Sequence, residues 1–316
     1  MKKICIISDI HDWHSNQIKS QLLKKGCEVI KCSFSDINIS FNRSSKGFSI
    51  KNKNVDLHGV WVRFIGNGTL QEITYKLSVL HFLSDIGIYV HNSACIIEKT
   101  VDKFRTSSIL KLNKFNTPDT WVSLDKKRFK KSVQTLLKHN RKVIAKPLFG
   151  SQGKGIKVIL KKSDIFDFKS ADGVFYFQEV VGNINSKIFS DIRVLVSNHK
   201  VISCVQRYSK NIVTNVAKGA LVKKINITKN LSETCILISK IFNIGYAGID
   251  IKTHKGENFI LEINSIPSWK GLQSVDKRNI TKLLVKDFLN IIKNKNGKRK
   301  KYLPHHKKTF LSKLFR

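Results

Sequence analysis

The chain has 316 residues with 58 Lys or Arg against 22 Asp or Glu, which gives a formal net charge of +36 at pH 7. Its length suggests two or three packed units, and its 41% hydrophobic and 25% charged residues are those of an ordinary globular protein. No run of about 18 apolar residues occurs, which excludes a transmembrane helix. The short apolar run at 4–7 predicts a buried strand rather than a signal peptide, so we expect a cytoplasmic protein.

The positive charge suggests a nucleic-acid-binding protein as one alternative. Most of the basic residues are lysines spread along the chain, however, and Ile and Asn are also abundant, which is typical of codon bias in an A+T-rich genome. No RNP, zinc-finger or aromatic–basic pattern accompanies the charge, so we expect no specific nucleic-acid partner. The excess charge still favours anionic ligands such as ATP or an acidic substrate. The six cysteines form no C-x-x-C pair, which favours reduced thiols.

Residues 1–95 are predicted to form an N-terminal α/β domain, because strand and helix signals alternate as they do in parallel sheets covered by helices. We expect strands at 3–8, 27–32, 59–64 and 88–90, and helices at 16–25 and 69–83.

From about residue 96 the pattern changes to longer runs of strands, typical of an α+β arrangement. A helix is expected at 97–112, followed by strands at 143–146, 156–160, 174–181, 192–197 and 201–206, a helix at 232–242, a hairpin of 247–252 with 259–263, and a closing helix at 279–293. We divide this part into subdomains 96–178 and 179–292. Residues 293–316 hold ten Lys or Arg and no acid, which predicts a disordered basic tail, with an amphipathic helix at its end as the alternative.

Three oxygen-bearing side chains stand on the predicted hairpin. Asp250 is on one strand, and Glu262 and Asn264 lie two apart on the next, so the latter two point to the same face. Carboxylate and amide oxygens suit Mg²⁺, and a metal would compensate acids placed in otherwise apolar strands. Surface strands whose acids face water are the alternative.

A glycine-rich turn follows Lys146, which ends a predicted strand and can meet a phosphate as a point charge. The turn contains Gly150, Ser151, Gln152, Gly153 and Gly155, and another strand follows it. Glycine lets a backbone approach phosphates closely, so we interpret the turn as a flap over a nucleotide. A plain glycine-rich hairpin is an equal alternative.

Two further strands carry polar side chains. Gln178, Glu179 and Val180 end one strand, which can offer backbone groups to an adenine edge, although the segment alone reads as an ordinary strand. Asp191 and Arg193 share a face of the next strand, with Arg207 beyond. The arginines suit bidentate contact with a triphosphate or carboxylate, and a salt bridge from Asp191 to one of them is the alternative.

The loop after the first strand holds His11, Asp12 and His14, at the edge where α/β sheets bind ligands. These residues can serve a metal or substrate site, but we favour solvated loop residues because the spacing alone is weak. Arg63, at the end of another strand, is the better candidate for holding a substrate carboxylate.

The order of these motifs resembles that of ATP-grasp ligases over about residues 96–292, with the first 95 residues matching the α/β domain that precedes the ATP-grasp fold in such enzymes. The motifs are 100–104 (TVDKF), 145–147 (AKP), 150–155, 178–179 (QE), 191–193 (DIR), 214–215 (TN), 248–250 (GID) and 262–267 (EINSIP). The chain is most similar to the RimK-type glutamate ligases, whose members modify a ribosomal protein, a deazaflavin cofactor, tetrahydromethanopterin or an amino-group carrier. Residues 207–209, 214–217 and Trp269 look like those of the tetrahydromethanopterin branch.

The resemblance implies roles residue by residue. Lys103 and Lys146 would contact phosphates under a lid at 150–155, Glu179 and Val180 would lie at the adenine, and Asp191 would lie near the ribose. Asp250, Glu262 and Asn264 would hold two Mg²⁺ ions, for which Mn²⁺ can substitute. Arg193, Arg207 and Asn215 would face the transferred phosphate or the acyl phosphate.

The implied activity is ATP-dependent ligation of a carboxylate to an amine through an acyl phosphate, adding an amino acid such as glutamate to a small-molecule or peptide acceptor. Lysines, arginines and metals suffice for this chemistry. The partners are ATP and the two substrates, and a homo-oligomer is common in similar enzymes. A nucleotide-binding protein without catalysis is a further alternative, which the intact Asp250, Glu262 and Asn264 disfavour.

Overall fold

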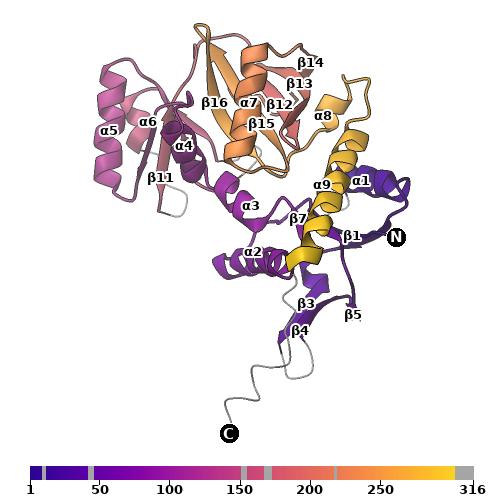
Figure 1. Ribbon diagram of the computed structural model, residues 1–316. Coiled ribbons are helices and arrows are strands. Elements are labelled where there is room, and N and C mark those ends of the chain that lie inside the picture. The colour runs from indigo at the N-terminus through magenta and orange to yellow at the C-terminus, as the bar shows by residue number, and fades with distance from the viewer. Residues whose placement is uncertain (9–11, 42–45, 151–154, 167–172, 217–218, 303–316) are drawn as a thin grey trace.

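The computed structural model describes residues 1–8, 12–41, 46–150, 155–166, 173–216 and 219–302. Three larger sheets in this part of the chain are each backed by helices (Figure 1). Residues of two of these sheets, and residues that directly follow a strand of the third, line a cleft.

The N-terminal sheet is parallel, with strand order β2-β1-β6-β7. Its strands are β1 (Lys3–Ile7), β2 (Glu28–Cys32), β6 (Gly59–Val62) and β7 (Tyr89–His91). Alternate residues of β1 join different cores, since Ile4 and Ile6 pack with α1 (Trp13–Leu23) and α9 (Ile280–Tyr302), whereas Cys5 and Ile7 pack with α2 (Leu70–Asp85) and α3 (Ala94–Val101). The predicted α/β arrangement is therefore confirmed.

A small sheet beside this domain was not predicted. It consists of β3 (Ile37–Phe41), β4 (Lys46–Ile50) and β5 (Lys53–Asn54), joined in antiparallel order after the short helix η1 (Phe34–Asp36). Ile37 and Ile50 bury themselves in the core that β1 shares with α2, which attaches the sheet to the domain.

The second large sheet is antiparallel, with strand order β10-β9-β11-β8. It comprises β8 (Thr120–Ser123), β9 (Val143–Lys146), β10 (Lys157–Ile159) and β11 (Phe175–Glu179), backed by α5 (Lys126–Lys138) and α6 (Lys162–Phe166). Phe129 of α5 packs against Phe175 and Phe177, so one face of this sheet is closed by its own helices.

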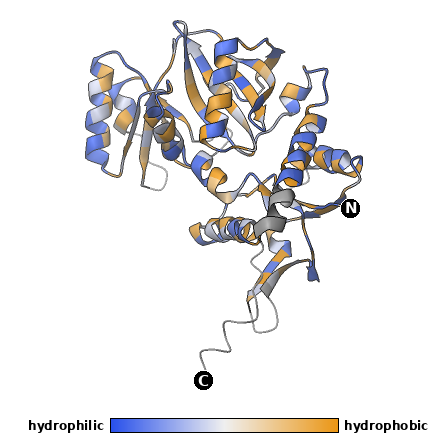
Figure 2. Ribbon diagram, in the orientation of Figure 1, coloured by the Kyte–Doolittle hydropathy of each residue, from blue (hydrophilic) through white to orange (hydrophobic). Residues whose placement is uncertain are grey.

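The third large sheet is antiparallel and carries most of the predicted site. Its strands, in order β14-β13-β12-β15-β16, are β12 (Phe189–Ser197), β13 (Lys200–Ser209), β14 (Leu221–Lys224), β15 (Tyr246–His254) and β16 (Glu257–Asn264). Val194, Ile249 and Ile263 pack with α7 (Lys229–Ile241), which carries both hydrophobic and hydrophilic residues in Figure 2 and buries Leu231, Cys235 and Ile238. Residues one position away along each strand face the opposite side, and these include Arg193, Asp250 and Glu262.

Two helical predictions need correction. The helix expected at 97–112 is two helices, α3 and α4 (Lys103–Leu112), because Asp102 has an extended backbone and caps α4 by accepting a hydrogen bond from Arg105 N–H at 3.0 Å. The closing helix α9 continues to Tyr302, so the disorder predicted from residue 293 is wrong as far as 302, and 303–316 lie outside the described residues.

Helix α9, at the C-terminal end of the described chain, packs against the N-terminal sheet. Its buried Phe288 lies against Trp61 of the N-terminal sheet, with ring centroids 4.8 Å apart. Gly59 has no room for a side chain, because an added Cβ would lie 2.6 Å from Ile292 Cδ1. A short helix, α8 (Lys270–Gln273), precedes α9. Among the helices of the described residues, none combines the length and the apolar character that a bilayer span requires.

Candidate active site

A cleft of about 1350 Å³ lies where the two antiparallel sheets and the N-terminal domain meet. It is lined by twelve of the residues singled out in the sequence: Lys146, Gly150, Gln178, Glu179, Val180, Asp191, Arg193, Arg207, Asn215, Asp250, Glu262 and Asn264. Lys103 is not among the lining residues, but its ammonium donates a hydrogen bond to the carbonyl oxygen of the lining residue Gly150 at 2.9 Å. Ser151, Gln152 and Gly153 lie outside the described residues.

Two arginines surround the carboxylate of Asp250. Arg193 donates from Nε and Nη2 at 2.6 Å each, and Arg207 Nη2 lies 3.0 Å from Asp250 Oδ2. Burial raises the pKa of Asp250, but the two guanidinium charges outweigh burial and bring the pKa to about 2. The carboxylate is therefore ionised at neutral pH, inside a wall of fixed positive charge.

Asp191 forms a second buried pair with Arg207. Arg207 Nε donates to Asp191 Oδ1 at 2.7 Å, and the hydroxyl of Thr214 donates to Oδ2 at 2.6 Å. The salt bridge considered as an alternative in the sequence is thus present, and Asp191 orients Arg207. Its predicted place near a ribose stays a prediction.

The oxygen ligands expected for Mg²⁺ lie together and fit the ion. The Cα atoms of Asp250 and Glu262 are direct partners across β15 and β16. The Cα of Asn264 is paired with that of Gly248, two residues before Asp250 on β15. Three of the roughly four lone-pair positions of Asp250 meet arginines, and Asn264 Oδ1 accepts one bond from Ile266 N–H at 2.9 Å, so each keeps capacity for a cation. No three His, Cys, Asp or Glu side chains of the described chain gather as a metal site. Magnesium here would be completed by the amide and by phosphate oxygens.

Lys146 faces this group from the other sheet. Its ammonium donates to Gln178 Oε1 at 2.7 Å, and Gln178 Nε2 in turn donates to the hydroxyl of Thr120 at 3.0 Å. Burial lowers the pKa of Lys146 to about 8 although Glu262 opposes the change. Burial also lowers the pKa of Lys103. An anion brought into the cleft would therefore stabilise the charged form of both ammonium groups.

The stretch predicted to meet adenine is partly occupied. The N–H groups of Glu179 and Val180 donate to the carbonyl oxygens of Asp119 and Lys142, at 2.9 and 2.8 Å. The Glu179 carboxylate is paired with Arg141. These two amides are therefore not free to bind a ring edge, and the predicted place of this segment at the adenine stays a prediction.

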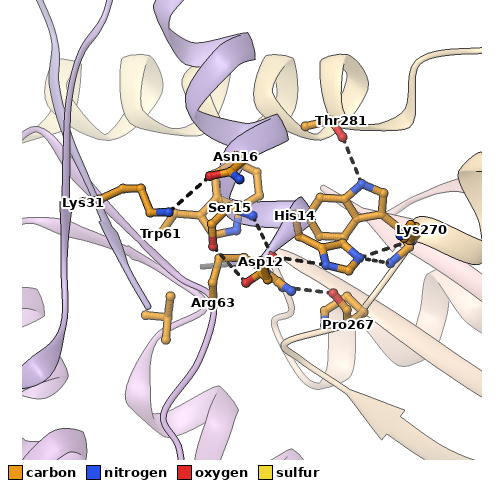
Figure 3. Close-up of polar contacts among 12 residues, drawn as sticks. Asp12, His14, Ser15, Asn16, Lys31, Trp61, Arg63, Pro267, Lys270 and Thr281 are labelled. Atoms are coloured by element: carbon orange, nitrogen blue, oxygen red, sulfur yellow. Dashed lines mark hydrogen bonds and ion pairs between the residues drawn. The ribbon is translucent and has the colours of Figure 1, made fainter. Parts of the chain in front are cut away.

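The N-terminal domain contributes residues that sequence reasoning undervalued. Asp12 and His14 are not solvated loop residues, because Asp12 caps α1 and His14 Nε2 accepts hydrogen bonds from the N–H groups of Trp269 and Lys270, at 3.1 and 3.2 Å (Figure 3). Both line the cleft together with Arg63. His11 lies outside the described residues.

Lys252 also lines the cleft and was not singled out. It lies two residues after Asp250 on β15, so the alternation of the strand could have placed it on the same face. Its ammonium donates to the carbonyl oxygen of Ser190 at 2.6 Å.

Comparison with known proteins decides the family. The model of the RimK-like ATP-grasp domain matches residues 100–288. The chain belongs to the RimK-like ATP-grasp family. It is 32% identical over 295 residues to tetrahydromethanopterin:alpha-L-glutamate ligase of Methanococcus maripaludis, covering 91% of this chain and 98% of that relative. The enzyme of the same name from Methanocaldococcus jannaschii is 28% identical, over 86% of this chain and 94% of its own length.

Solved structures show the same fold. The ATP-grasp ligase PsnB complexed with minimal precursor, Mg and ADP superposes with a TM-score of 0.71 at 18% identity, covering 92% of this chain and 98% of PsnB. The predicted ATP-grasp fold, the family resemblance and the ligase activity are thus confirmed, and this RimK-like protein is an ATP-dependent ligase that forms an amide from a carboxylate and an amine.

Proposed function

We propose that this ligase binds ATP with two Mg²⁺ ions, which Mn²⁺ can replace, and joins the amino group of an amino acid such as glutamate to a carboxylate of an acceptor. The observation that carries the proposal is the convergence of Asp250, Glu262 and Asn264 beside two fixed arginines on one sheet face, with Lys146 across the cleft. The names of the relatives support glutamate, and tetrahydromethanopterin or a related acid is the first acceptor to consider.

The first step transfers the γ-phosphoryl group. A carboxylate oxygen attacks the γ-phosphorus, the bond to the β-phosphate oxygen breaks, and ADP leaves. Lys103 and Lys146 hold the phosphates, while Arg193 and Arg207 stabilise the charge spread over the moving phosphoryl oxygens. The ions, held by Asp250, Glu262 and Asn264, supply further positive charge when bound. Because Asp191 and Asp250 fix both guanidinium groups in advance, little reorganisation is needed during the reaction.

The second step forms the amide. The amine nitrogen attacks the acyl carbon, the bond from that carbon to the phosphate oxygen breaks, and the nitrogen loses a proton as phosphate departs. Arg207 and Asn215, which share the cleft wall, are placed to stabilise the acyl phosphate and the leaving phosphate. The cleft surrounds the intermediate on three sides, which limits its loss to water.

The expected setting is the cytoplasm. All six cysteines are free and five are buried, which suits a reducing compartment. Self-association stays part of the proposal as a common property of similar enzymes.

The experiment is ADP release by the purified chain with MgATP, across a panel of amino acids and acidic acceptors, with mass spectrometry of the products. We expect release that needs one amino acid and one acceptor, and a product whose mass is their sum less water. Release with an acceptor alone, or an unchanged acceptor mass, would contradict the proposal.

A further inference from the structure

We propose that Arg63 binds a non-reacting carboxylate of the amino-acid substrate at the N-terminal wall of the cleft. The inference rests on the proposed function, because it concerns the same cleft and assumes that an amino acid supplies the amine. An amino acid that reacts through nitrogen keeps its own carboxylate charge, and the enzyme has to accommodate that charge away from the phosphates.

Arg63 is buried to an extent that is unusual for an arginine without a counter-ion. Its residue exposure is 5%, yet among the described residues no acidic side chain forms an ion pair with it. Its backbone is fixed, since Arg63 N–H donates to the carbonyl oxygen of Ile7 at 2.9 Å. Asp12 is near enough for the Arg63 charge to favour its ionised form, but no carboxylate of the described residues contacts the guanidinium. A buried charge without a contacting counter-ion is costly, and an anionic ligand would reduce that cost.

The hydrogen bonds of Arg63 use one corner of the guanidinium. Nη1 donates to the hydroxyl of Tyr246 at 3.2 Å and to the carbonyl oxygen of Pro267 at 3.0 Å. Nε is buried without a partner, and no bond of Nη2 to a described residue is seen. The edge formed by Nε and Nη2 thus has no hydrogen-bond partner among the described residues, although Arg63 lines the cleft.

That unpartnered edge is the one that carboxylates prefer. Arg193 and Arg207 bind Asp250 and Asp191 through Nε and Nη2 in this same protein. A carboxylate on the matching edge of Arg63 would make the same two parallel bonds. The guanidinium carbon of Arg63 lies over the ring of Trp269, 5.0 Å from its centroid, and this contact helps to hold the guanidinium in place.

Two neighbours of Arg63, Asp12 and His14, are engaged with other groups. Asp12 accepts from Ser15 N–H at 2.8 Å and from the Ser15 hydroxyl at 3.0 Å, so its carboxylate is turned to the cap of α1 (Figure 3). His14 accepts at Nε2 and its pKa is lowered, mainly by burial, so it is neutral and supports the backbone at Trp269.

Arg63 stands beside the reacting groups without belonging to them. It contacts Pro267, and a Cβ at Gly248 would lie 3.3 Å from Pro267 Cβ and 3.6 Å from Arg193 Nε. Pro267 therefore lies between Arg63 and the part of β15 against which Arg193 packs. Arg193 serves the phosphoryl group, and Arg63 is left to hold the substrate that approaches from the N-terminal side.

The test compares the wild type with Arg63→Met, using L-glutamate and its two monoamides, glutamine and isoglutamine, at saturating MgATP and acceptor. For the wild type we expect one monoamide to have a KM about 10- to 100-fold above that of glutamate, because it lacks the charged partner of Arg63. In Arg63→Met the KM for glutamate should rise by a similar factor, the preference over that monoamide should vanish, and the KM for ATP should stay unchanged.

The matched control is Arg128→Met, which removes the same charge from an exposed position on α5 and should leave every KM unchanged. Arg63→Lys covers the case in which the methionine variant does not fold, since a lysine can still bond Pro267 but has no forked edge, and it should also lose the preference. Unchanged glutamate KM in either folded variant, or wild-type enzyme that treats glutamate and both monoamides alike, would overturn the inference.

Wild-type turnover tests the proposed function separately. If another amino acid replaces glutamate, the same comparison uses that amino acid and its amide. If no amino acid serves as the amine, both proposals fail, whereas turnover with intact selectivity in the Arg63 variants sinks this inference alone.

Discussion

Lys146 is a buried ammonium whose pKa of about 8 lies within reach of ordinary assay conditions. If the charged form binds phosphate, as proposed, then as pH rises through 8 the free enzyme loses the proton and ATP binding weakens. We predict that the KM for ATP rises above pH 8 in the wild type. Lys146→Arg should remove that inflection, because arginine stays charged. A KM that is flat from pH 7 to about 9.5 in the wild type would contradict the role of Lys146.

Glu262 offers the sharpest test of the metal site. Its Cα is paired with that of Asp250 across the hairpin. We predict that Glu262→Gln lowers kcat by at least about 100-fold while the circular dichroism spectrum is unchanged. The change removes a negatively charged oxygen ligand but leaves the volume of the side chain nearly the same. Glu233→Gln, at an exposed position on α7, is the control. Near-normal ADP release by the Glu262 variant would make the metal assignment wrong.

At the scale of elements, the turn that leads into β10 requires a glycine at position 155. Gly155 has φ of +72°, and an added Cβ would lie 2.7 Å from Pro147 Cγ. Gly256, in the turn between β15 and β16, has φ of +81° and nothing within 4 Å. We predict that Gly155→Ala costs about 1–3 kcal/mol more unfolding free energy than Gly256→Ala, because both are strained but only the former clashes. Denaturant titration of both variants measures this, and equal losses would refute it.

The sequence predicted most of the large strands because their apolar runs are long and bounded by turns. The hairpin with Asp250 and Glu262 was predicted from two strand segments around a turn, and the Cα atoms of the two residues are paired across it. The break at Asp102 was missed because an aspartate inside a polar helical pattern gives no strong stop signal. The β3–β5 sheet was missed although apolar and polar residues alternate along β3, which is the pattern of a half-buried strand. β5 has only two polar residues, and the attachment of the sheet depends on packing of Ile37 and Ile50 against a domain that the local pattern does not show.

At the scale of the whole molecule, Phe288 of α9 links the C-terminal helix to the N-terminal sheet. It is fully buried and lies against Trp61 and Tyr89. We predict that Phe288→Ala lowers the unfolding free energy by about 3–5 kcal/mol, as expected for a large aromatic side chain removed from a core. Phe41→Ala, at a side chain that is 72% exposed, should change it little. Chemical denaturation decides, and similar effects of the two changes would contradict this packing.

The cleft itself could be predicted only in part. The motifs from Lys146 to Asn264 follow one another in the sequence, and their order identified the family. The wall of the cleft that the N-terminal domain forms depends on contacts between distant segments. For example, Asn92 Nδ2 donates to the carbonyl oxygens of Tyr246 and Ser265 at 2.7 Å each. No local pattern records such contacts, so the sequence could name Arg63 as a candidate for a substrate carboxylate, but the contacts of His14 and Arg63 with residues 246–270, and the place of Asp12 in the cleft lining, came from the structure.

The central claim is that the γ-phosphate of ATP activates the acceptor carboxylate. The measurement is mass spectrometry of the phosphate released when an acceptor labelled with ¹⁸O in its carboxylate is converted. One labelled oxygen should pass into each phosphate and the other should stay in the amide, because the bridging oxygen of an acyl phosphate leaves with phosphorus. Unlabelled phosphate, or label in AMP instead, would contradict the account.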